Sequence, residues 1–382
     1  MTLSCQRDRF LIPPDLAYLN SAYMGPISRA TLEAGKSGVG RKASPWRITP
    51  PDFFTEVNQL RGLVAKLLMT RAEHIALIPS VSYGIAVAAR NLPLERGKTV
   101  ITLDESFPSM VYAWRQSARD SGAEHLTVPR PADDDWTAAV LERIDSRTAV
   151  VSVPQIHWTD GGLLNLEAIG ARLREVGAAL VVDATQSLGV LPLDVNRIRP
   201  DFLMAAGYKW LLGPYGLGYL YAAPERQQGR PLEENWISRP DSEDFAGLTR
   251  YRDGYQPGAR RYDVGETSNF ALVPMAIAAL EEVLDWNPAR ILEYTAAIND
   301  RIIAGLEGSG LAPVPNERRG RHYLGLRSRT PFPPELLYRL SQEQVHLSIR
   351  GQSLRISPHV FNNLSDADRL VRVVGDVLAE AG

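Results

Sequence analysis

Two residues of complementary chemistry, Asp183 and Lys209, each follow a short apolar run. Asp183 closes the run 180–182 (LVV), and Lys209 comes shortly after the run 202–206 (FLMAA). Runs of this kind are typical of strands that are buried on both faces of a parallel sheet. Ligands of open α/β sheets bind just beyond the carboxyl ends of such strands. We therefore expect an acid and an amine at the rim of one pocket, and we expect Gln186 at the same rim.

An acid and an amine at one sheet edge are the two groups that pyridoxal phosphate (PLP) requires. The cofactor forms a Schiff base with a lysine, and a carboxylate on its ring nitrogen keeps the ring protonated as an electron sink. Tyr208, Trp210 and Leu211 flank Lys209, and desolvation there would favour the neutral, nucleophilic amine. For either residue alone, a helix-capping Asp183 or a surface Lys209 is the better interpretation. Together they favour the cofactor, and we expect both to be catalytic.

The segments 181–195 (VVDATQSLGVLPLDV) and 205–221 (AAGYKWLLGPYGLGYLY) resemble the central signature of the class V aminotransferase family. This family comprises fold-type I PLP enzymes and includes cysteine desulfurases, kynureninases and isopenicillin N epimerase-like proteins. Weaker motifs extend the resemblance from about Tyr18 to the end of the chain. The resemblance implies PLP as cofactor, an amino acid as substrate, and a homodimer with active sites at the subunit interface.

The expected fold class is α/β, the fold of type I PLP-dependent transferases. Strands alternate with helices between about residues 75 and 221, which predicts right-handed crossovers and a mainly parallel sheet. By the resemblance this sheet has seven strands, and a smaller α+β domain follows it. We expect an N-terminal segment lining the active site (1–24), a large cofactor-binding domain (25–273) and a C-terminal small domain (274–382).

A phosphate site is predicted where a strand near residue 78 leads into a helix. Small and hydroxyl residues form this turn, and free backbone N–H groups at a helix N-terminus bind anions. In the family this turn binds the cofactor phosphate, and Val81 and Ser82 match it. Taken without the lysine motif, Ser82 is more simply an ordinary N-cap.

The resemblance assigns three further cofactor contacts. Phe107 follows another predicted strand and matches the residue that stacks on the cofactor ring, a role that a flat side chain suits. Gln186 should hydrogen-bond the phenolic oxygen, and Tyr208 should help to hold the phosphate. One departure concerns Ala206, which stands where desulfurases have a phosphate-binding serine, so phosphate binding is rearranged or weakened here.

Four residues are expected on the substrate side. Arg355 lies on a late predicted strand, and its guanidinium fork suits an α-carboxylate. In the family, the matching arginine binds this carboxylate. Trp158 occupies the position of a desulfurase asparagine, which puts desulfurase-type contacts in doubt. His157 could orient cofactor or substrate, but a structural histidine is at least as good an interpretation. Asn20, in the segment 20–23, matches a family segment at the mouth of the site, although a plain turn explains it equally well.

Some basic and hydroxyl residues keep open roles. In the family, a Gly-Thr region reaches the partner's cofactor phosphate, and Thr267 matches it only with an insertion. Whether Thr267 or Ser268 makes that contact is not decided by the sequence. Arg47, Arg260 and Arg261 could bind a second, distal carboxylate, but surface or interface charges are equally good interpretations.

Composition narrows the functional classes. The chain has 382 residues and a net charge of −2, from 42 basic and 44 acidic residues. This balance gives no electrostatic case for a nucleic acid or a membrane as partner. The single cysteine, Cys5, fits a reducing compartment, and no apolar leader or spanning run is visible. We expect a cytoplasmic protein without a metal site.

The favoured function is a PLP-dependent aminotransferase, with a lyase or an epimerase as a close alternative. Desulfurases need a cysteine near the carboxylate arginine, and the corresponding stretch 345–352 has none, so that branch is disfavoured. A noncatalytic PLP-binding or regulatory protein is an alternative of another class. It predicts loss of Lys209 or Asp183, or a fused DNA-binding domain, and none of these is seen.

Overall fold

The computed structural model describes residues 3–381. Its centre is a seven-stranded sheet with the strand order β2-β8-β7-β6-β5-β3-β4. All neighbours pair in parallel except β8, which is antiparallel to both β7 and β2. The predicted seven-stranded, mainly parallel sheet is therefore confirmed. The strands are β2 (Ile75–Ile78), β3 (Thr99–Leu103), β4 (Glu124–Val128), β5 (Thr148–Pro154), β6 (Ala179–Asp183), β7 (Phe202–Ala206) and β8 (Gly218–Ala222).

Side chains of the sheet alternate between two apolar layers because successive strand residues point to opposite faces. In β6, for example, Leu180 and Val182 join one core cluster and Val181 joins the other. The first face is covered by α2 (Thr55–Leu67), α5 (Trp136–Arg143), α6 (Leu166–Val176) and α8 (Leu272–Trp286). The second face is covered by α3 (Val81–Asn91) and α4 (Pro108–Ser121). Burial on both faces explains why these strands read as unbroken apolar runs.

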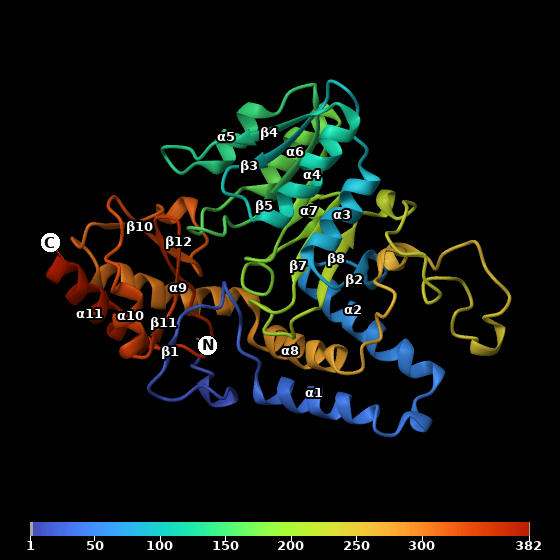
Figure 1. Cartoon of the computed structure of the whole chain (residues 1–382), viewed down its shortest axis with the longest axis horizontal. Helices are drawn as coiled ribbons and strands as arrows, with labels where there is room; N and C mark the ends of the chain where they lie inside the picture. Colours follow the sequence, from blue (N-terminus) through green and yellow to red (C-terminus); the bar gives the residue numbers. More distant parts are fainter. Residues whose placement is uncertain (1–2, 382) are drawn as a thin grey trace.

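The C-terminal part forms a separate layer beside the large sheet (Figure 1). Its antiparallel sheet has the order β12-β13-β10-β9. Its strands are β9 (Leu311–Pro313), β10 (Leu324–Ser328), β12 (Ser348–Arg350) and β13 (Ser353–Ile356). Its helices are α9 (Pro288–Gly305), α10 (Leu336–Gln342) and α11 (Leu364–Ala381).

The N-terminal segment packs on this C-terminal part through β1 (Ala17–Tyr18), which pairs in parallel with β11 (Val345–His346). Asn20 bridges to Ser357 just after β13. The first long helix, α1 (Arg29–Arg41), then runs alongside α8, as Figure 1 shows in blue and orange. The N-terminal residues thus reach the junction of the two sheets.

The position of the domain boundary stays a prediction. Helix α8 packs against α1 and α2, whereas α9 packs against α11. On this packing we propose that the small domain begins near Pro288, after α8, rather than at residue 274. With this boundary, the large domain would include the short helix α7 (Val195–Ile198) and the long loop from Gln227 to Pro257. Among residues 3–381, no helix combines the length and apolar character needed to cross a bilayer.

Candidate active site

The carboxyl ends of the parallel strands surround one cavity of about 270 Å³. Eight of the predicted site residues line it, and they come from the end of β6, from the loops after β3, β5, β6 and β7, and from the start of α3. Additional lining residues include Ser80, Thr185, Ala206 and Tyr215. The predicted residues that line the cavity are Val81, Ser82, Phe107, Trp158, Asp183, Gln186, Tyr208 and Lys209.

Strand order sets the sequence of side chains across this cavity. Since β8 runs against both neighbours, β2, β7, β6, β5 and β3 all end at the same sheet edge. Ser82 follows β2, Lys209 follows β7, Asp183 ends β6 and Trp158 follows β5. With neighbouring strands about 4.8 Å apart, the ends of β2 and β5 are separated by about 19 Å. The predicted phosphate end and the Trp158 end are therefore opposite sides of the cavity.

Lys209 is a buried amine with only 8% of its surface exposed. Burial lowers its pKa to about 8, and the nearby Asp183 carboxylate opposes part of this shift. Arg355 and Arg350 lower the pKa of Lys209 further. Its Nζ lies 5.7 Å from the ring centre of Phe107. With a pKa of about 8, an appreciable fraction of this lysine is neutral near physiological pH, and the neutral amine is the form that acts as a nucleophile or proton acceptor.

The backbone around Lys209 is fixed from two sides. The Gly25 N–H donates to the Tyr208 carbonyl at 2.9 Å. A Cβ at Gly25 would lie 2.2 Å from the Lys209 carbonyl oxygen, so only glycine fits there. On the other side, His359 donates from Nε2 to the Trp210 carbonyl at 3.1 Å, while its Nδ1 accepts the next backbone N–H at 2.9 Å. Both supports come from outside the sheet.

The lowered pKa of Lys209 carries a stability cost that depends on pH. The unfolded lysine keeps its ordinary pKa of 10.5, so between about pH 8 and 10.5 the unfolded protein binds more protons than the folded one. Stability therefore rises with pH across this window. We expect Lys209→Met to raise the free energy of unfolding of the cofactor-free protein by at most ~3 kcal/mol at pH 7. The gain should shrink above pH 8 and vanish near pH 10.5.

Urea unfolding at a series of pH values measures this effect. The matched control is Lys36→Met, because Lys36 is an exposed residue of α1. An equal gain at pH 7 and pH 10 for Lys209→Met would contradict the buried, shifted amine.

Asp183 and Gln186 are held in place by neighbouring loops. Asp183 accepts the Thr185 N–H at 2.8 Å, and burial raises its pKa, opposed by Thr185 and by Lys209. Gln186 accepts the Trp210 indole N–H at 2.8 Å and donates to the Ala22 carbonyl at 3.1 Å. The indole can only donate, so it fixes which end of the Gln186 amide is oxygen. One amide N–H of Gln186 then remains for a ligand.

The start of α3 has the features of an anion site. Ser80, not Ser82, is the N-cap, and its hydroxyl accepts the Tyr83 N–H at 3.2 Å. The Ser80 and Ser82 hydroxyls lie 2.8 Å apart. Val81 and Ser82 are the first two helical residues, whose N–H groups have no partner within a helix. Because Ser80 is the N-cap, the hydroxyl of Ser82 is not needed for that role.

Phe107 and Trp158 form one wall of the cavity. Their rings meet edge to face with centroids 5.4 Å apart. The Trp158 indole donates to the Glu105 carbonyl at 2.6 Å, and Tyr323 donates its hydroxyl to the Trp158 carbonyl. On the other side of Lys209, the Tyr208 ring packs against Tyr215 with centroids 4.6 Å apart.

Arg355 is buried behind Trp158 and does not itself line the cavity. Its Nε donates to the Ser348 hydroxyl at 3.0 Å, and its Nη1 lies 3.5 Å from the Trp158 carbonyl. Among residues 3–381, its buried Nη2 has no hydrogen-bond partner. Asn20 also lies outside the cavity lining and accepts the Ser348 hydroxyl at 3.1 Å. Asn20 therefore supports Arg355 through Ser348.

His157 is adjacent to the cavity wall but does not line it. It is fully buried and stacks on Trp136 with centroids 4.8 Å apart. Its Nε2 donates to the Asp104 carbonyl at 3.1 Å, so its Nδ1 accepts from the Thr159 hydroxyl at 2.9 Å. Burial lowers its pKa. Both ring nitrogens are engaged within the protein, which favours the structural interpretation.

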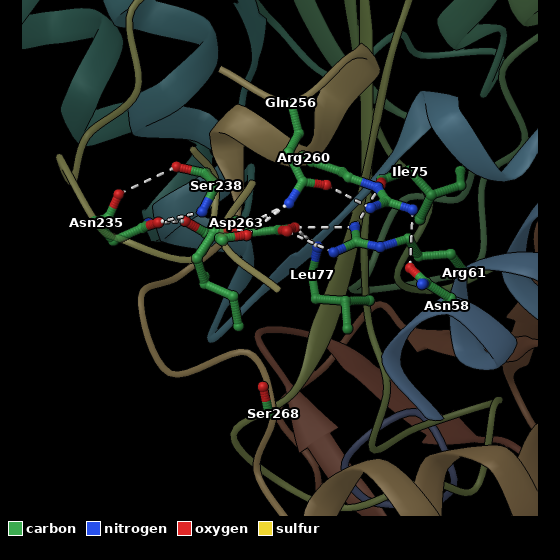
Figure 2. Close-up of polar contacts among 12 residues, drawn as sticks. Asn58, Arg61, Ile75, Leu77, Asn235, Ser238, Gln256, Arg260, Asp263 and Ser268 are labelled. Carbon is green, nitrogen blue, oxygen red and sulfur yellow. Dashed lines mark hydrogen bonds and ion pairs between the residues drawn. The ribbon is translucent and has the colours of Figure 1, made fainter. Parts of the chain in front are cut away.

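Thr267 and Arg260 lie in another part of the large domain, around a buried ion pair of Arg61 with Asp263 (Figure 2). Asp263 also accepts the Leu77 N–H at 2.8 Å. Arg260 donates to Gln256 and Asn58, as Figure 2 shows. Arg261 donates to the Gly229 carbonyl and to Gln228, Ser268 donates to the Phe53 carbonyl, and Arg47 is exposed. None of these residues lines the Lys209 cavity.

Sequence reasoning missed Arg350, Tyr215, Thr185 and Ser80. Ser80 precedes the α3 run and had an N-cap signal of its own. Thr185 could be found from its place two residues after Asp183. The only sequence signal for Arg350 was the alternation of polar and apolar residues along its strand. Its approach to Trp158 depends on how two domains meet, which no local pattern records.

Comparisons with known proteins agree with this architecture. The family model for aminotransferase class-V matches residues 50–369. Isopenicillin N epimerase from Streptomyces clavuligerus is 30% identical over 267 residues, which cover 67% of this chain and 66% of that protein. Uncharacterized aminotransferase YcbU from Bacillus subtilis (strain 168) is 27% identical over 359 residues, or 90% of this chain and 88% of YcbU. Among solved structures, the apo cysteine desulfurase from Thermococcus onnurineus NA1 has a TM-score of 0.84 at 19% identity, covering 98% of this chain and 97% of that one.

At 19% identity the desulfurase structure bears on the fold alone, and it matches the fold expected from the sequence. The family match is broader evidence, because it spans most of the chain, including all the residues that line the cavity and Arg355 behind them. This chain therefore belongs to the aminotransferase class-V family.

Proposed function

We propose that this protein is a PLP-dependent enzyme that acts at the Cα atom of an amino acid, as an epimerase or a lyase. The observation that carries the proposal is the pairing of a buried, low-pKa Lys209 with a buried Asp183 in one cavity at the carboxyl edge of the sheet. Perturbed titratable groups that converge in a cavity are typical of catalytic sites.

The residues present fit the cofactor. The first turn of α3 offers Ser82 and two free backbone N–H groups to a phosphate. Asp183 would hold the ring nitrogen, the free N–H of Gln186 would reach the phenolic oxygen, and Lys209 would bind the aldehyde covalently. Ala206 lines the cavity without a hydroxyl, so Ser82 and Tyr208 are left to bind the phosphate. When bound, the cofactor supplies an electron sink that makes the Cα proton of the substrate acidic.

The chain's own groups then supply binding and proton transfer. Arg355 has an unpartnered, buried Nη2 beside the cavity wall, and we assign it the α-carboxylate, bound through its guanidinium fork. Lys209, with a pKa of about 8, accepts the Cα proton at Nζ, since a base works best with a pKa near the working pH. Phe107 and Trp158 present their ring surfaces to this side of the cavity.

The relatives favour the epimerase or lyase alternative over the aminotransferase that the family resemblance ranked first. The 30%-identical relative is named an isopenicillin N epimerase. A desulfurase remains disfavoured, because the turn between β12 and β13 carries no cysteine. The single Cys5 instead lies beside the Phe361 carbonyl, at 3.7 Å. A homodimer in which Thr267 reaches the partner's phosphate stays a prediction of the resemblance.

The decisive experiment measures exchange of the Cα proton in D₂O for a panel of L-amino acids, together with product analysis. An epimerase gives the D-enantiomer with deuterium at Cα, and a lyase gives ammonia or a side-chain fragment. An aminotransferase instead gives a stoichiometric keto acid. No visible absorption band after addition of PLP, and no exchange with any amino acid, would refute the proposal.

A further inference from the structure

Two arginines, Arg350 and Arg355, lie on one face of the small-domain sheet beside the cavity. The register of β12 and β13 pairs Ser348 with Arg355 and Arg350 with Ser353. Paired residues and residues two apart share a face of a sheet. Arg350 and Arg355 are therefore diagonal neighbours, whose Cα atoms are about 7–8 Å apart in such a pair.

Both guanidinium groups converge on the same wall of the cavity. The Cζ of Arg350 lies 6.0 Å from the Trp158 ring centre, and that of Arg355 lies 5.9 Å from it. Trp158 lines the Lys209 cavity. Each arginine also lowers the pKa of Lys209, and Arg355 lowers the pKa of Arg350 after the larger effect of burial. Three basic groups thus share one region.

No carboxylate of the described chain neutralises either arginine. Arg350 donates to the Ile349 carbonyl at 2.8 Å, and the contacts of Arg355 are to carbonyl and hydroxyl oxygens. Asp183, the acid beside Lys209, is the group that we assign to the cofactor ring. Partly desolvated cations without a counter-charge are costly, and an anionic ligand would remove that cost.

The cofactor phosphate does not explain both charges, because its proposed site at α3 lies across the cavity. Four strand spacings, about 19 Å, separate the end of β2 from the end of β5 near Trp158. A single α-carboxylate would satisfy the one free edge of the buried Arg355. Arg350 is partly exposed and keeps most of its N–H donors free, so it is available to bind a second anion.

We propose that Arg350 binds a carboxylate at the end of the substrate's side chain, so that the preferred substrate is an amino dicarboxylic acid or a larger amino acid ending in a carboxylate. Arg355 takes the α-carboxylate, and Arg350 selects the distal one. This inference rests on the proposed function for the orientation of the substrate. The pair of anion sites does not depend on the proposed function, because it is inferred from the register of β12 and β13 and from the distances of both arginines to Trp158.

Calorimetric titration of the PLP-loaded protein with unreactive acids tests the proposal. Glutarate carries two carboxylates. Butyrate is the same molecule with one of these carboxylates replaced by a hydrogen atom. The wild-type protein should bind glutarate at least tenfold more tightly than butyrate. Arg350→Gln should reduce this ratio to about one, Arg350→Lys should keep part of it, and Arg355→Gln should weaken both acids. Arg143→Gln removes the same charge from the exposed end of α5 and should keep the wild-type ratio.

Two results would overturn the assignment: no preference for glutarate in the wild type, or an unchanged ratio in Arg350→Gln. An unchanged ratio with an equal loss of affinity for both acids would mean that both arginines clamp one carboxylate. The visible spectrum of the same wild-type sample separates this inference from the proposed function. A tenfold ratio without a cofactor band would support the pair of anion sites and refute the proposed function. A cofactor band without the ratio would support the proposed function and refute the pair of anion sites.

Discussion

Replacing Lys209 by alanine is expected to remove the visible absorption band that PLP gives with the wild-type protein and to lower Cα-proton exchange by roughly 10³-fold or more. The effect is large because one side chain serves twice, as the covalent attachment point and as the proton carrier. Lys209 is buried beside Asp183. Among the described residues, no other lysine lines the cavity. Absorption spectra and exchange rates in D₂O measure both losses.

Two controls make this result specific. Lys36→Ala removes an exposed lysine of α1 that pairs with Glu33, and it should keep both the band and the exchange rate. Lys209→Arg keeps a positive charge but cannot attach the aldehyde, and it should lose the band as alanine does. Retention of both the band and exchange in Lys209→Ala would show that the cofactor binds elsewhere.

The sheet edge and its central pair could be predicted from the sequence because their signals are local. The runs before Asp183 and Lys209 are apolar because β6 and β7 are covered on both faces. Polar residues directly after such runs can only lie at the sheet edge. The reversed direction of β8 had a weaker signal, because an antiparallel interior strand and a parallel one are equally apolar. Only the glycine-rich hairpin pattern of residues 216–221 indicated it.

Other residues could not be assigned because their roles depend on distant parts of the chain. His157 looks like a site residue from its loop, but Asp104 and Trp136 engage its ring from other elements. Asn20 supports Arg355 only through Ser348 of β12. Such contacts depend on the meeting of two domains, which no pattern within one segment records.

Asp183→Asn is expected to leave a folded protein that still binds PLP covalently but turns over at least about 10²-fold more slowly. The amide oxygen can accept the Thr185 N–H as the carboxylate does, so the local fold should survive. An amide carries no negative charge, however, and cannot stabilise a protonated ring nitrogen in a buried site. The electron sink is weakened, and kcat should fall while the visible band remains.

The pattern of losses distinguishes this role of Asp183 from a structural one. Asp194→Asn is the matched control, because Asp194 caps α7 by accepting the Asn196 N–H at 2.8 Å, and an asparagine caps equally well. Its kcat should stay within about twofold of the wild type. The ratio of the affinities for glutarate and butyrate should also persist in Asp183→Asn, because the arginines bind the carboxylates and Asp183 does not. A kcat for Asp183→Asn close to that of the wild type would mean that the ring nitrogen needs no charged partner, and the assignment of Asp183 to the ring nitrogen would fall.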